Sequence, residues 1–411
     1  MKKYLFIALA AAGMLSSCSS DDTVANNSED LVPIKIGMGN IATNVTRGTG
    51  TVGAVGASTN AWKGELVNIY MFNQGTLTLA QNLGTAIYDN EEFQTPAGED
   101  GSTTFATATS GEVKFYPASG NFDFFGYRTD GAETAAPALN TAGDAYVAPI
   151  TIDGSQDVMG AQCDKAAAAA ALDAAAGTTG TTKFFSAYAA RKGVQPELIF
   201  KHLLSRLTFE VKAGNSNASA AGFAVEITDI RVKSNATGEL YVASAADGFE
   251  PKIEWATVTD PATEYATLTL KQADGTDTDL DLDPLAPFSL EGNSAFAPVG
   301  EALLVAPGDA KYSLEIAMKQ KKIIDPVAYA ADPATGWTEI VMDPYKTDIV
   351  IPSVDDPATP EDESLNPGAA KAGSSYNVQI VVYGLEEIQV KTILTPWEDG
   401  GTISIDPDAN I

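Results

Sequence analysis

His202 is the only histidine among 411 residues, so a Ser-His-Asp catalytic triad would have to use it. It lies between Lys201 and Leu203 in the stretch IFKHLLSRL, which carries no catalytic signature, and no G-x-S-x-G nucleophile motif occurs in the chain. A single histidine cannot supply the usual zinc ligands, and neither a P-loop nor a Rossmann fingerprint is present. We therefore predict a structural His202, no catalytic, metal-binding or cofactor-binding residues, and a protein that is not an enzyme.

Four aspartates alternate along the stretch DGTDTDLDLDP, at Asp277, Asp279, Asp281 and Asp283. On a strand they would share one face, and in a loop they could hold calcium. The EF-hand pattern fails, because its sixth position counted from Asp277 is Leu282 rather than glycine. We favour a solvated acidic edge that discourages aggregation between strands.

Acidic side chains outnumber basic ones by 54 to 25, which gives a net charge of −29. Nucleic acid and anionic membrane surfaces are therefore poor partners, and the charge suits a solvated cell-surface protein. Cys18 and Cys163 are the only cysteines. If Cys18 carries a lipid, no intramolecular disulfide is possible, and the fold must depend on its core.

The first 17 residues have the pattern of an export signal. Lys2 and Lys3 precede an apolar run, residues 4–15, that is too short to span a bilayer. The run ends in Leu-Ser-Ser-Cys at residues 15–18, which is similar to a bacterial lipobox. That similarity implies cleavage before Cys18 and acylation of its thiol; the alternative is an ordinary signal peptide with an incidental cysteine.

Residues 18–31 are polar and predict a flexible tether. Its Ser-Ser-Asp-Asp start, residues 19–22, resembles the acidic stretch that routes lipoproteins of Bacteroidales to the outer face of the outer membrane. A surface-exposed lipoprotein of the outer membrane is the localisation that this resemblance implies.

A short strand and an unusual linker follow the tether. Residues 32–38, VPIKIGM, alternate with a period of two, which predicts a half-buried β-strand. Its apolar face consists of Val32, Ile34, Ile36 and Met38. Arg47 is the only basic residue between Ile36 and Trp62, and it stands in a Gly/Thr-rich stretch without helical or strand pattern. On residue type alone, Arg47 is a surface arginine in a loop.

Many short alternating runs separated by Pro and Gly predict an all-β protein built of β-sandwiches. Residues 196–214 form the clearest long strand, and residues 375–397 form a closing hairpin. In that hairpin Tyr376, Val378, Ile380 and Val382 oppose Ile388, Val390, Thr392 and Leu394. The exception is the Ala-rich stretch 164–177, which predicts one helix inserted in the first half. Two halves are the simplest partition: an N-terminal domain over 48–197 and a C-terminal domain over 198–411.

Five segments, in this order, resemble the fimbrillin family of Bacteroidales, the Mfa-like, type V pilin-like fimbrial subunits. They are FDFFGYRTDG, QDVMGAQ, LIFKHLLSRLTFEV, ALLVAPG and YNVQIVVYGLEEIQVKTILTPWEDG. With the lipobox and Arg47 they span nearly the whole chain. The Ala-rich helix and the acidic stretch 353–366 depart from the family, which puts surface detail in doubt rather than the fold.

The resemblance implies two tandem transthyretin-like, Greek-key β-sandwich domains. It implies that an arginine-specific protease cuts between Arg47 and Gly48 and removes the first strand with residues 32–47. The groove so opened would accept a strand from another copy or a related fimbrillin, and a fimbria would grow. Gln389–Ile405 is the candidate donor, because a terminal segment can leave without severing an internal connection. The same hairpin could equally be a permanent part of the second sandwich.

Two classes of function follow from these observations. The first is a structural subunit of an adhesive cell-surface fimbria, with a non-polymerising anchor or tip as its variant. The second is a surface lipoprotein that binds or processes polysaccharide, since four tryptophans could stack on sugars, although lone tryptophans more often belong to a core. The linker around Arg47 favours the first class.

Overall fold

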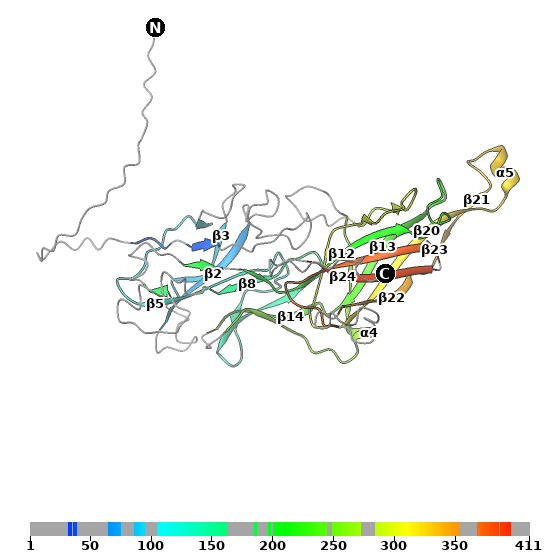
Figure 1. The fold of residues 1–411 in the computed structure, drawn as a ribbon. Coiled ribbons are helices and arrows are strands. Elements are labelled where there is room, and N and C mark those ends of the chain that lie inside the picture. Colours follow the sequence, from blue (N-terminus) through cyan, green and yellow to red (C-terminus); the bar gives the residue numbers. More distant parts are fainter. Residues whose placement is uncertain are drawn as a thin grey trace, which may run out of the picture. The chain divides into compact units, whose positions relative to one another are not determined.

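A computed structural model gives the fold of the protein (Figure 1). The described residues are 32–34, 36–38, 65–74, 86–94, 105–162, 185–186, 196–198, 200–244, 249–272, 284–352, 368–385 and 387–395. Within them the protein is all-β, with four sheets and two short helices, which confirms the predicted class. The helix predicted over 164–177 lies outside the described residues.

The first sheet has nine strands and is called here the N-terminal sheet. Its order is β10-β1-β4-β3-β2-β5-β8-β11, with β9 also paired to β5. The strands are β1 (Ile36–Met38), β2 (Leu66–Gln74), β3 (Tyr88–Gln94), β4 (Phe105–Ala108), β5 (Asn121–Arg128), β8 (Met159–Gln162), β9 (Phe185–Ser186), β10 (Glu197–Leu198) and β11 (Lys201–His202).

A four-stranded sheet joins segments from both sides of residue 197, in the order β15-β14-β7-β6. Its strands are β6 (Ala138–Leu139), β7 (Ala145–Thr151), β14 (Thr237–Ser244) and β15 (Lys252–Trp255). The division into domains 48–197 and 198–411 stays a prediction, and this sheet shows that chain from both predicted domains pairs directly.

The remaining two sheets belong to the second half of the chain. One has the order β18-β12-β23-β24, with β19 also paired to β12. Its strands are β12 (Ser205–Ala213), β18 (Ala297–Pro298), β19 (Leu303–Val305), β23 (Ser375–Gly384) and β24 (Glu387–Thr395). The other has the order β16-β13-β20-β21, with β17 on β13 and β22 on β20. Its strands are β13 (Val225–Ser234), β16 (Ala266–Thr269), β17 (Phe288–Ser289), β20 (Lys311–Ile323), β21 (Trp337–Val341) and β22 (Tyr345–Val350).

Alternating hydrophobicity places these strands as the sequence predicts. In β20, Tyr312, Leu314, Ile316 and Met318 are all buried. The closing hairpin has the predicted register, with Tyr376 opposite Leu394 and Val382 opposite Ile388. The predicted register is therefore confirmed. Its physical cause is the short turn between the two strands, together with the apolar face, which a slip by one residue would turn to solvent.

The long strand predicted over 196–214 is wrong as a single element. Its described residues form three strands, β10, β11 and β12. Residues 202 to 207 are buried without alternation, because the chain leaves the N-terminal sheet here and enters the sheet of β12.

Residues 112–116 form no strand; an isolated bridge joins Phe115 to Pro33.

Two short helices begin in the same way. α4 (Pro261–Glu264) follows Asp260 and α5 (Pro326–Ala331) follows Asp325; each aspartate caps its helix and proline takes the first turn. In the described ranges, no helix has the length and apolar character needed to cross a membrane.

Candidate functional site

The first strand of the chain lies between two other strands of the N-terminal sheet. β1 pairs antiparallel with β4, with Ile36 opposite Ala106 and Gly37 opposite Phe105. On its other side it pairs parallel with β10, where Gly37 is opposite Glu197 and Met38 opposite Leu198. β1 is therefore an interior strand. Its removal would leave β4 unpaired on that side, and β10 without any strand partner among the described residues.

The chain just before β1 continues the antiparallel pairing. The N–H of Ile34 donates to the carbonyl oxygen of Lys114 at 2.9 Å, and the N–H of Tyr116 donates to the carbonyl oxygen of Val32 at 2.9 Å. The isolated bridge between Pro33 and Phe115 lies between these two bonds. Residues 32–34 and 36–38 thus both pair with the chain of residues 105–116, as their period of two predicts for a strand.

The side chains of this segment help to fill a separate core. Ile34 is 7% exposed, and Val32 is partly buried against the same cluster. The cluster contains Ile34, Val67, Ile69, Met71, Tyr88, Phe93, Tyr116, Phe122, Phe124, Met159, Ala161, Leu198 and Phe200. Ile36 and Met38 lie in β1 itself. The space that residues 32–38 occupy between β10 and the chain of residues 105–116 is called the slot below.

The two ends of the N-terminal sheet come from one stretch of chain. β10 lies at one end of the sheet and β11 at the other, and only two residues separate them in the chain. Residues 197–202 therefore link the two ends of the N-terminal sheet. Leu198 and Phe200 are fully buried in the core under the slot. Gly126 makes room for them, because a Cβ there would lie 2.7 Å from the ring of Phe200. Sequence analysis missed this second wall of the slot, and its only local signal was the apolar run LIF before Lys201.

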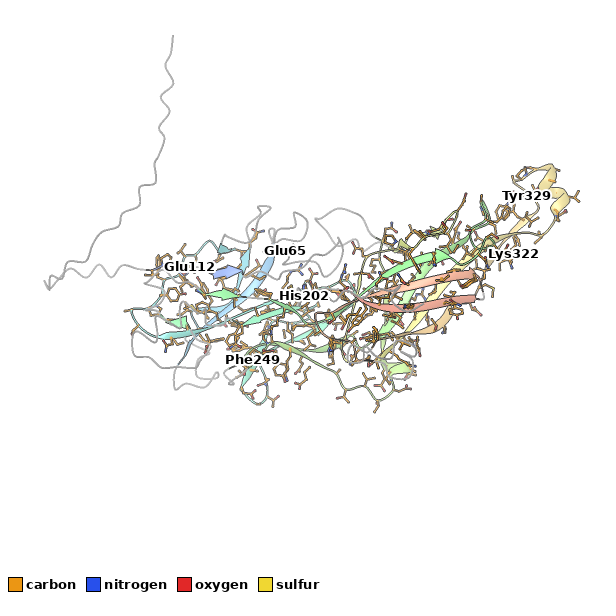
Figure 2. The ribbon with its side chains drawn as sticks, in the orientation of Figure 1. Glu65, Glu112, His202, Phe249, Lys322 and Tyr329 are labelled. Atoms are coloured by element: carbon orange, nitrogen blue, oxygen red, sulfur yellow. The ribbon has the colours of Figure 1, made fainter. Side chains whose placement is uncertain are left out.

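The same stretch ends in a buried pair of side chains, His202 and Asp157. Nδ1 of His202 lies 2.9 Å from Oδ1 of Asp157, and both side chains are 1% exposed. Figure 2 labels His202. Among the described residues, Oδ2 of Asp157 meets no hydrogen-bond donor. The pair joins β11 to the loop before β8, two neighbouring strands of the N-terminal sheet. His202 is thus placed to hold structure, and no sequence pattern indicates its partner.

A second cluster, of partly buried charged side chains, lies beside this pair. Nη2 of Arg128 bonds Glu65 at 3.0 Å and Asp130 at 2.7 Å, and its Nη1 donates to the carbonyl oxygen of Asp157 at 3.3 Å. Burial raises the pKa of both Glu65 and Asp130, although Arg128 opposes the rise. Burial lowers the pKa of Arg206, at the start of β12, to about 10, while Asp157 opposes that fall. These are the costs of charges held away from water, and their mutual pairing offsets them.

The arrangement can bind an extended strand and has no visible means of bond-breaking chemistry. Recognition would come from main-chain hydrogen bonds to β4 and β10 and from side chains entering the core beneath. Within the described ranges no group of three or more His, Cys, Asp or Glu side chains could hold a metal ion.

The predicted modification residues cannot be placed in this geometry. Cys18, Arg47 and Gly48 lie outside the described residues, as do Asp277, Asp279, Asp281 and Asp283. Of the predicted removable strand, Val32 and Ile34 contact the core. Ile36 pairs with Ala106 of β4, and Met38 pairs with Leu198 of β10.

Comparison with known proteins gives one family. The sequence pattern of the family described as fimbrillin-like matches residues 54–324. No curated protein is significantly similar to the chain in sequence.

Solved structures with a similar arrangement share little sequence with this chain. A candidate cell adhesion protein of Bacteroides uniformis is 14% identical, with a TM-score of 0.42, and the match covers 90% of this chain and 100% of that one. The fimbrial anchor protein Mfa2 of Porphyromonas gingivalis is 10% identical, with a TM-score of 0.36 and coverage of 88% and 98%. The C-terminally truncated tip fimbrial protein Mfa3 of the same organism is 11% identical, with a TM-score of 0.35 and coverage of 89% and 100%.

Proposed function

This chain belongs to the fimbrillin-like family of fimbrial and cell-adhesion proteins, which are structural rather than enzymatic, and from that premise we propose that it is a fimbrial subunit that assembles by strand exchange. The match to 54–324 confirms the family resemblance of the sequence. In the proposal, a protease removes the segment that contains β1, and a strand from another copy or a related fimbrillin enters the slot. The mature protein then forms part of a fimbria that acts in adhesion.

The observation that carries this proposal is the place of β1 in its sheet. When an edge strand leaves, one neighbouring strand loses its hydrogen bonds, whereas the loss of an interior strand leaves unpaired groups on two neighbours. Each buried backbone group without a partner costs about 1–3 kcal/mol. The emptied slot would therefore favour any strand that restores the ladder and fills the space of Ile34, which is the requirement for assembly by strand addition.

The proposed cut lies between Arg47 and Gly48, nine residues after β1 ends at Met38. Arg47 is the only basic residue between Ile36 and Trp62, so an arginine-specific protease has one choice in this linker. Cleavage there separates all of residues 32–38 from the chain that forms the rest of the slot. Before the cut, β1 fills the slot in the same molecule and the precursor stays monomeric.

Replacing Arg47 with alanine should stop assembly. We expect the wild-type chain, treated with an arginine-specific protease, to begin at Gly48 and to form a ladder on gels and rods in electron micrographs. The Arg47→Ala variant should remain a monomer, because its β1 cannot be released. Arg191→Ala, which removes an arginine elsewhere in the chain, is the matched control and should assemble as wild type does. Equal polymerisation of wild type and Arg47→Ala would refute the cut.

We also propose that Cys18 is acylated and holds the precursor in the outer membrane before processing. The support is the Leu-Ser-Ser-Cys sequence at residues 15–18, which places a cysteine directly after the apolar run. The Cys18→Ala precursor should leave the detergent phase for the aqueous phase in phase partitioning. Normal detergent partitioning of that variant would show that Cys18 carries no lipid.

A further inference from the structure

The two walls of the slot are held in different ways. The first wall, residues 105–116, begins with β4, which pairs with β3 as well as with β1; Phe93 lies opposite Ala108 and Gln94 opposite Thr107. The second wall is β10, the end strand of the N-terminal sheet, and β1 is its only strand partner in the described part of the chain. The first wall therefore keeps a neighbour when β1 leaves, whereas β10 loses its strand pairing.

The chain that follows β4 stays attached to β3. The N–H of Thr109 donates to the carbonyl oxygen of Glu92 at 2.9 Å, and the Thr109 hydroxyl donates to the same oxygen at 3.2 Å. The hydroxyl of Ser110 donates to Oε1 of Glu91 at 2.6 Å. None of these bonds involves residues 32–38, so they do not depend on the presence of β1.

Lys114 holds the part of the first wall that lies nearest the start of the removable strand. Its Nζ donates to the carbonyl oxygen of Ile87 at 2.8 Å and lies 3.4 Å from Oε2 of Glu91. The same group lies over the ring of Tyr88, 4.7 Å from the ring centroid. The carbonyl oxygen of Lys114 accepts from the N–H of Ile34 in the slot. Lys114 therefore binds the start of β3 with its side chain and the removable strand with its backbone.

The groups that Lys114 binds are themselves fixed. The N–H of Ile87 donates to the carbonyl oxygen of Met71 in β2 at 2.9 Å, and Glu91 binds Ser110 through its other carboxylate oxygen. The side chains of Lys114 and Glu91 are 24% and 20% exposed, so their pairing is screened less than that of an exposed ion pair. The first wall is thus linked to the middle of the N-terminal sheet by contacts that do not pass through β1.

We propose that Lys114 is a positioning residue of the slot, and that an incoming strand pairs with residues 114–116 before it pairs with β10. This inference rests on the proposed strand exchange. Less freedom is lost when a strand meets backbone groups already in place than when its receptor must be ordered as well. β10 has to be ordered during pairing, so its contacts form later. Lys114 then controls the rate at which a strand enters, and Leu198, buried under the slot, controls how long the strand stays.

The test measures the rates at which a fluorescent peptide of residues 32–46 binds to, and leaves, the chain that begins at Gly48, the proposed mature form. Hydrogen exchange in β23 and β24, compared with that of the full chain, checks that this chain stays folded. Lys114→Met removes the charged donor and keeps the aliphatic stem. It should slow association at least about tenfold, the effect of one lost hydrogen bond to a charged group, and change dissociation less than about twofold.

Three further variants complete the test. Lys114→Arg keeps the charge and the donors and should bind the peptide as the parent chain does. Lys319→Met is the matched control, because Lys319 pairs with Glu226 and Glu339, both at 3.3 Å, in the sheet of β20; it should leave both rates unchanged. Leu198→Ala should speed dissociation and leave association nearly unchanged.

Hydrogen exchange of the intact full chain gives a second measurement that needs no peptide. Pairs that form last when a strand closes break first when it opens, so amides bonded across β1 and β10 should exchange faster than the N–H of Ile34, which is bonded to Lys114. In the full chain with Lys114→Met this difference should disappear.

Equal association rates for Lys114→Met and its parent would overturn the inference, as would a change confined to dissociation or faster exchange at Ile34 than across β1 and β10. Each of these results would leave strand exchange standing, because the peptide would still bind. A parent chain that stays folded and binds no peptide would refute the proposed strand exchange, and this inference with it.

Discussion

A chain that begins at Gly48 should lose most of the stability of the N-terminal sheet, and a peptide of residues 32–46 should restore it when added in trans. The truncated chain lacks Ile34, whose burial contributes about 1.5–3 kcal/mol. It also leaves backbone groups of β4, β10 and residues 114 and 116 unpaired, at about 1–3 kcal/mol for each group that stays buried. The sum is comparable to the whole stability of a typical domain, about 5–15 kcal/mol. Urea unfolding, monitored by hydrogen exchange at the amides of β4 and β10, measures this loss of stability.

Variants of the added peptide distinguish binding of a strand in the slot from general stabilisation of the truncated chain. A 32–46 peptide with Ile34→Asp keeps the backbone and length but cannot fill the core, so it should not restore the sheet. A peptide of residues 389–405 should restore it if that segment is the donor. If only the unchanged 32–46 peptide restored the sheet, the slot would be supported and residues 389–405 would not be the donor. A truncated chain as stable as the full one would show that β1 is dispensable.

The place of the donor segment in the present fold bears on that outcome. β24 (Glu387–Thr395) is paired with β23 along its whole length, and Ile388 and Thr392 are buried. The part of Gln389–Ile405 inside β24 would have to break these bonds to serve a neighbour, whereas residues 396–405 follow the last described pair. The peptide comparison therefore also reports how much of the segment a slot can use.

How much of the slot the sequence predicts depends on the distance between its parts. The period of two in residues 32–38 predicts the strand and its inward face, and the burial of Ile34 agrees. Neither wall can be predicted, because the pairing of residue 36 with residue 106 and of residue 38 with residue 198 has no local pattern. By contrast, the register of the β23–β24 hairpin follows from a two-residue connection between alternating runs.

The stretch 196–214 shows how a correct hydrophobic pattern can still give a wrong element. Its apolar residues at odd positions from 203 to 211 are buried as expected. The even positions 202, 204 and 206 are buried too, since the chain crosses there from the N-terminal sheet to β12. The His and Arg within this apolar run are the signal in the sequence that the strand is interrupted, because charged or titratable side chains are rarely buried without a partner. The partner, Asp157, is 45 residues away and has no signal in the sequence.

Replacing His202 with leucine should lower the free energy of unfolding by about 1–3 kcal/mol, the usual cost of leaving a buried polar group without its partner. Leucine fills similar space, but it leaves the Asp157 carboxylate buried, and Oδ2 of that carboxylate already meets no donor among the described residues. His202→Gln should lose less, because its amide can still donate to Oδ1.

The double variant His202→Leu/Asp157→Leu distinguishes an unpaired polar group from lost packing. It should be more stable than His202→Leu alone, since no unpaired buried carboxyl group remains, and the double-mutant cycle measures the coupling in denaturant unfolding. Because His202 lies four residues from Leu198 of β10, His202→Leu should also loosen the wall of the slot, seen as faster hydrogen exchange at residues 36–38. A loss below about 1 kcal/mol, or a double variant less stable than either single one, would show that the pair does not hold residues 197–202 in place.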